Sequence, residues 1–152
     1  MTAERMVQPV RWERVALGGL VAGVILILVQ MVFHYVHGGP NWWFFRALKH
    51  PIAGAPSIIR YAGLHFISGV MAIYLYAAVR PRYGPGGPKT AAAVGVVYWV
   101  IRYAIPTIDF YPLLAPEFTG PGWVSGWWIG SAVELAGIIL AILAGAFAYK
   151  EH

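Results

Sequence analysis

The chain is 152 residues long, the length of one domain. Hydrophobic residues make up 59% of it and charged residues only 11%, whereas about 25% of the residues in soluble domains are charged. Lipid must therefore solvate much of the surface. The net charge of +5 then indicates the topology of the chain in the membrane rather than nucleic-acid binding. The chain has no cysteine, which excludes disulfides, thiolate metal sites, iron–sulfur ligation and covalent c-type haem.

The first predicted element is a membrane span over residues 15–36. A span needs roughly 20 apolar residues at about 1.5 Å each, and this run is long enough. Gly19 and Gly23 form a G-x-x-x-G pair within it, which predicts the close approach of another helix. The segment 41–50, NWWFFRALKH, is too short and too charged to span, and its tryptophans and basic residues predict an interfacial helix.

The second predicted span covers residues 58–79. It follows Pro51 and Pro56, which we expect to break the chain. After it comes a basic connector, RPRYGPGGPK at 80–89, whose prolines and glycines predict irregular backbone. The second span is therefore expected to be separated by irregular segments from the elements on both sides.

The third predicted span, 90–111, carries Arg102 well inside it. A guanidinium at that depth is costly, so such residues usually face a bundle interior or a water-filled cavity and have a partner. Pro106 removes the hydrogen bond to the carbonyl of Arg102, which predicts a kink there. The last span is predicted over 124–149 and contains Glu134, the only acid deep in another apolar run.

We expect Arg102 and Glu134 to form a pair. They lie roughly 13 Å and roughly 16 Å from the outer ends of their spans, and consecutive antiparallel helices are usually neighbours. A histidine and a glutamine lie roughly 10 Å deep on the same side, and two tyrosines of the third span are close to the arginine in sequence. The predicted buried polar cluster or ligand site comprises Arg102, Glu134, His65, Gln30, Tyr98 and Tyr103.

Two interpretations of this cluster stay open. It is either a structural pair that fixes helix packing or a substrate or proton site. As a ligand site, the cluster would hold a quinone, or a b-type haem bound by histidines of different helices. A metal ion is a further alternative, with His34, His37 and Asp109 as candidate ligands. No cofactor is predicted outright, and since no catalytic motif is complete, a non-catalytic protein is favoured.

The basic residues predict the orientation of the chain. Four spans place both termini on one side, and the loops on the cytoplasmic side of a membrane carry the excess of lysine and arginine. The side with the termini would hold seven such residues and the other side three. These are Arg5, Arg11, Arg14, Arg80, Arg82, Lys89 and Lys150 on the first side, and Arg46, Lys49 and Arg60 on the second.

The stretch 72–92, AIYLYAAVRPRYGPGGPKTAA, resembles a loop in a family of small, uncharacterised bacterial four-span membrane proteins. The glycine-rich opening of the first span, VALGGLVAGVI, is similar as well. The resemblance implies a bacterial membrane protein of four spans, which we expect in the inner membrane, while the asymmetry of basic residues predicts that both termini are cytoplasmic. It implies no activity, so it assigns no functional residue.

The sequence thus predicts an all-α integral membrane four-helix bundle, with a short interfacial helix between the first two spans. The expected function is that of a small non-catalytic subunit that packs against a larger membrane complex, respiratory or photosynthetic, or forms a homo-oligomer. One alternative is a binding or redox protein that holds a quinone, lipid or haem near Arg102, Glu134 and His65. Another is a small proton-coupled transporter.

Overall fold

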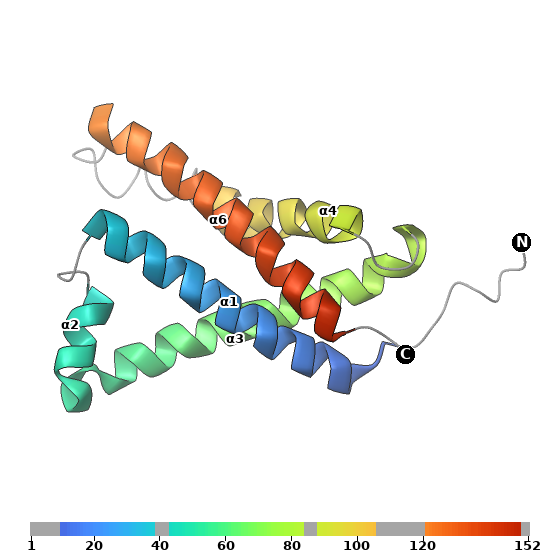
Figure 1. Ribbon diagram of the computed structural model, residues 1–152, viewed down its shortest axis with the longest axis horizontal. Helices are drawn as coiled ribbons and strands as arrows, with labels where there is room; N and C mark the ends of the chain where they lie inside the picture. The colour runs from blue at the N-terminus through green and yellow to red at the C-terminus, as the bar shows by residue number, and fades with distance from the viewer. Residues whose placement is uncertain (1–9, 39–42, 84–87, 106–120, 150–152) are drawn as a thin grey trace, which may run out of the picture.

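The computed structural model describes residues 10–38, 43–83, 88–105 and 121–149, and all regular elements in those ranges are helices (Figure 1). The prediction of an all-α chain is confirmed. In chain order the elements are α1 (Trp12–Gly38), α2 (Trp43–Lys49), α3 (Pro51–Tyr83), α4 (Pro88–Trp99), a π-helical segment η3 (Val100–Ala104) and α6 (Pro121–Ala148).

Within the described ranges, three helices are long and apolar enough to cross a membrane. They cover Trp12–Val36, Gly54–Pro81 and Trp128–Ala148, which overlap the first, second and fourth predicted spans. The third predicted span begins as the short helix α4 and continues as η3, and its last residues, 106–111, lie outside the described part of the chain. The structure therefore supports a multi-pass membrane protein with three candidate spans.

The outward face of α1 is apolar, as contact with lipid requires. Five large aliphatic side chains along this helix are between 45% and 64% exposed. In water such a stripe would be an unusually large apolar patch, whereas in a bilayer it is the surface that meets the acyl chains. The residues are Leu17, Leu20, Val24, Leu28 and Val32.

The helices alternate in direction, so that α1 begins and α6 ends at the same end of the molecule (Figure 1). Helix α1 packs against α3 and α6, while α4 packs against α6 and α3. Helix α2 lies at the opposite end, against the start of α3. It also contacts the end of α1, because the rings of Tyr35 and Phe45 meet edge to face at 5.5 Å.

Helices α1 and α3 meet through glycine, as the G-x-x-x-G pair predicts. A Cβ atom on Gly19 would lie 2.6 Å from the Cα of Val70, and one on Gly23 would lie 2.9 Å from the Cα of Phe66. From the other side, a Cβ on Gly69 would lie 2.6 Å from the backbone nitrogen of Gly23. Backbone touches backbone here, and only glycine leaves that space.

Helices α1 and α6 meet through glycine too. A Cβ on Gly18 would lie 2.6 Å from the carbonyl oxygen of Gly145, and one on Gly137 would lie 2.7 Å from a methyl of Val29. These contacts fix the relative height of α1 and α6. Val29 is opposite Gly137, so the residue that follows it, Gln30, is within about one turn of the level of Glu134.

The prolines before the second span do not break the chain as predicted. Helix α3 begins at Pro51 and continues through Pro56. Proline is tolerated in the first turn, where its missing N–H would be unsatisfied anyway, and Pro56 forfeits one hydrogen bond close to an exposed helix end. The helix also runs through Pro81 to Tyr83, so the connector is helical over its first four residues.

Candidate functional site

The π-helical segment η3 presents Arg102. The N–H of Ile105 donates to the carbonyl of Val100, five residues back, and Arg102 is in the middle of this wide turn, half-buried. The irregularity predicted at Arg102 thus takes the form of a π-turn, and Pro106, on which that prediction rested, lies just beyond the described residues. Such turns are rare and occur frequently at functional sites.

Glu134 is buried on α6, with 9% of its surface exposed. Arg102 and Glu134 do not form the predicted ion pair within the described ranges, but the charge of Arg102 acts on Glu134 through space. It acts in the same way on His65 and Tyr61 of α3. Tyr61 also experiences the charge of Glu134. These four residues, which we name the polar cluster, come from three helical segments that are far apart in sequence.

Residues His65 and Tyr61 are one helical turn apart and contact each other. The Nδ1–H of His65 donates to the carbonyl oxygen of Tyr61 at 2.8 Å, and the centres of the two rings are 4.2 Å apart. Since a carbonyl oxygen can only accept, Nδ1 carries the hydrogen. In the neutral ring Nε2 is then a bare acceptor, available to a hydroxyl or an N–H donor.

Two buried polar atoms lie one turn before the charged pair. Trp99 precedes Arg102 by three residues and Ser131 precedes Glu134 by three. The indole Nε1–H and the serine Oγ are buried, and neither has a hydrogen-bond partner within the ranges that the structure describes. A buried donor left unsatisfied costs about 1–3 kcal/mol, so both groups would gain from an acceptor placed beside them.

Tyr103 connects the π-turn to α6. Its ring stacks on Trp99, with the centres 6.1 Å apart. A Cβ atom on Gly130 would lie 3.8 Å from its hydroxyl oxygen and 3.3 Å from the ring of Phe33, so the phenol lies beside α6. Tyr98, which we predicted to be part of the buried polar site, is 5% exposed and belongs to the apolar core instead.

The histidines proposed as metal or haem ligands are not gathered in one place. No group of three or more acidic or histidine side chains in the described part of the chain could hold a metal ion. Gly23 of α1 contacts the carbonyl oxygen of His65, so His34 lies eleven residues, roughly 16 Å, further along the helix. That separation does not fit two axial ligands of one haem. The side chains of His37 and Asp109 lie outside the described residues.

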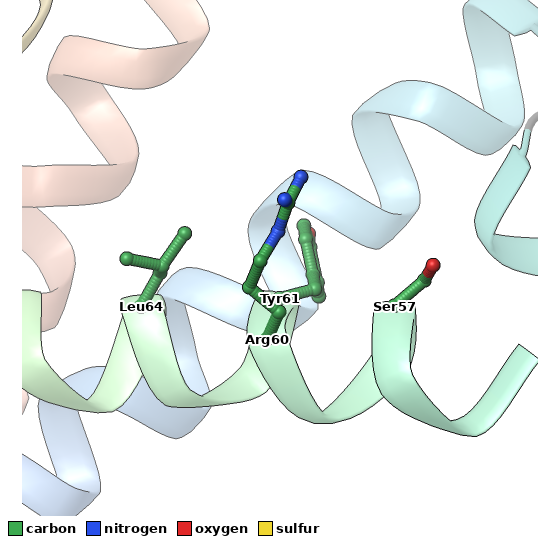
Figure 2. Close-up of a pocket in the computed structure, with 4 residues that line it drawn as sticks. All are labelled: Ser57, Arg60, Tyr61 and Leu64. Atoms are coloured by element: carbon green, nitrogen blue, oxygen red, sulfur yellow. The ribbon is translucent and has the colours of Figure 1, made fainter.

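An open groove lies along α3 and shares Tyr61 with the polar cluster. It has a volume of about 440 Å³ and is lined by Ser57, Arg60, Tyr61 and Leu64. Figure 2 shows Arg60 and Tyr61 between Ser57 on one side and Leu64 on the other. Tyr61 therefore belongs both to the groove wall and to the polar cluster.

Sequence reasoning missed Tyr61. The signal that could have found it is spacing, because Tyr61 precedes His65 by four residues and so shares its helix face. It was passed over because tyrosine near the end of a span is expected at the interface anyway.

No family model matches the chain, and neither the curated proteins nor the solved structures include a match. The candidate site therefore rests on the geometry of this chain alone.

Proposed function

We propose that this protein binds an amphipathic small molecule, a quinone or a lipid, with the polar head of the molecule at the polar cluster and its apolar tail towards the bilayer. The observation that carries the proposal is the continuity of groove and cluster. Tyr61 lines an open groove, and its side chain is in the electrostatic field of both Arg102 and Glu134.

The polar cluster suits a ligand head that carries both hydrogen-bond donors and acceptors. Arg102 supplies N–H donors, Glu134 supplies acceptor oxygens, and the Nε2 of His65 accepts. The Nε1–H of Trp99, at the end of α4, and the hydroxyl of Ser131, on α6, are further donors without a partner within the described ranges. Ligand sites are mostly apolar with a few convergent polar groups, and this arrangement has that composition.

Tyr61→Phe tests the proposal with the smallest possible change. The protein is purified in a mild detergent, and retained quinones and lipids are quantified by mass spectrometry. We expect the wild type to retain roughly one amphiphile per chain. We expect Tyr61→Phe to lower this affinity about two- to tenfold, because a lost hydrogen bond is worth about 0.5–1.5 kcal/mol and about 1.4 kcal/mol is tenfold.

Tyr74→Phe is the matched control. Tyr74 is on the same helix, is 40% exposed and stacks on Trp12, far from the groove. This variant should retain as much amphiphile as the wild type. Retention that is no higher than that of bulk lipid in the wild type, or equal losses in both variants, would contradict the proposal.

A four-span arrangement with both termini in the cytoplasm of a bacterial inner membrane belongs to the same proposal. It is supported by the alternating helix directions and by the predicted charge asymmetry. Because the chain has no cysteine, single cysteines can report the topology. A membrane-impermeant maleimide should label Lys49→Cys in intact cells and Lys89→Cys only after permeabilisation. Labelling of both from outside would exclude this topology.

Association with a larger membrane complex, homo-oligomerisation and proton-coupled transport stay predictions. No described contact favours them over ligand binding. Other subunits retained in the same mild purification would support the first of these, and a wild-type chain that elutes alone would count against it.

A further inference from the structure

The groove on α3 changes character along its length. Ser57, Arg60, Tyr61 and Leu64 follow the i, i+3, i+4, i+7 spacing of a single helix face. The hydroxyl and the guanidinium come first, and the aliphatic side chain comes last, about two turns deeper into the candidate span. A molecule lying in the groove would thus meet polar groups at one end and an apolar wall at the other.

The polar end of the groove carries a positive charge that no described acid balances. The described residues include two acidic side chains: Glu13, in the first turn of α1, and Glu134, which interacts with Arg102. Arg60 itself is exposed, and within the described ranges it forms no ion pair. A guanidinium presents a planar fork of donors that matches a phosphate, and Ser57 adds a hydroxyl one turn away.

The depth of Arg60 fits a lipid headgroup. It is six residues from the start of the candidate span at Gly54, which is roughly 9 Å along the helix axis. Lysine and arginine side chains close to a membrane surface are attracted to anionic lipid headgroups. The apolar end at Leu64, which is 52% exposed, would then lie against an acyl chain.

We propose that the amphiphile is an anionic phospholipid, with its phosphate held by Arg60 and Ser57 and one acyl chain along Leu64. This inference rests on the proposed function and deepens it, because it names the ligand class and the residue that selects it. Tyr61 then joins the headgroup region to the polar cluster, where Glu134 and Arg102 contact the remaining polar atoms of the head.

Arg60→Gln tests the assignment. The full-length protein is reconstituted in nanodiscs of phosphatidylcholine that contain a minority of phosphatidylglycerol, and bound lipid is counted by native mass spectrometry. We expect the wild type to be enriched in phosphatidylglycerol and Arg60→Gln to lose this enrichment about tenfold, equivalent to about 1.4 kcal/mol. Arg60→Lys keeps the charge without the fork and should fall between the two.

Arg46→Gln is the control for non-specific charge. Arg46 is an exposed cation on α2, at the same end of the molecule but outside the groove lining. This variant should bind phosphatidylglycerol as the wild type does. Equal losses in Arg60→Gln and Arg46→Gln, or retention of a quinone in place of an anionic lipid, would overturn the assignment and leave the binding of an amphiphile intact. A wild type that retains no amphiphile at all would overturn both proposals.

Discussion

Replacing Gly69 by alanine is expected to lower the free energy of unfolding by about 1–3 kcal/mol, the cost of overpacking a tight interface. The new methyl group would meet the carbonyl oxygen of Gly19 and lie 2.6 Å from the backbone nitrogen of Gly23. Neither group is the end of a flexible side chain, so α1 and α3 would have to separate. Thermal unfolding of the detergent-solubilised protein measures the effect.

The matched control for this substitution is Gly63→Ala on the same helix. A Cβ atom there meets nothing within 4 Å. The change should be neutral or slightly stabilising, because alanine is the better helix former by up to about 1 kcal/mol. If both variants unfold at the wild-type temperature, the backbone contact between α1 and α3 does not contribute to stability as described.

Removing the cation beside Glu134 is expected to have the second large effect. Glu134 is buried in the field of Arg102, although within the described ranges the two side chains do not form an ion pair. The cost of about 3–5 kcal/mol for breaking a buried ion pair is therefore an upper limit for the loss of this cation. Arg102 is only half-buried, so solvent screening reduces the loss, and we expect Arg102→Gln to destabilise the protein by about 2 kcal/mol. Glu134→Gln removes the other charge and should cost less than the loss of the cation.

The double variant decides whether the two residues act together. If the pair is coupled, Arg102→Gln combined with Glu134→Gln should be less destabilising than the sum of the single variants, by about 1–2 kcal/mol. Lys89→Gln, which removes an exposed cation at the start of α4, serves as the control and should add to Glu134→Gln without coupling. Strict additivity of Arg102→Gln and Glu134→Gln would show that the two charges are independent.

The sequence was sufficient for the features that depend on composition and spacing. An apolar chain with 11% charged residues has few alternatives to helices in lipid, and Gly19 with Gly23 indicates a close helix contact whatever its partner. That Arg102 acts electrostatically on Glu134 agrees with the expectation that charges in a membrane have partners, but the direct ion pair expected from the sequence is not present among the described contacts.

The details that depend on tertiary contacts could not be predicted. Pro56 is predicted to break the chain before the second span, yet α3 continues through it. Local propensity does not show that α2 packs against the start of α3. Tyr98 and Tyr103 are similar in sequence context, yet one belongs to the apolar core and the other lies beside α6. The difference arises in part from the π-turn between them, which shifts the helix face by one residue.

Gly18 and Gly19 are adjacent in sequence, yet one touches the backbone of α6 and the other that of α3. A movement of α1 towards either neighbour would therefore bring backbone against backbone, which no side-chain rearrangement can relieve. These close backbone contacts help to set the position of Tyr61 and His65 on α3 relative to Glu134 on α6. A molecule bound at the polar cluster would thus contact two helices whose distances to α1 are set by glycine.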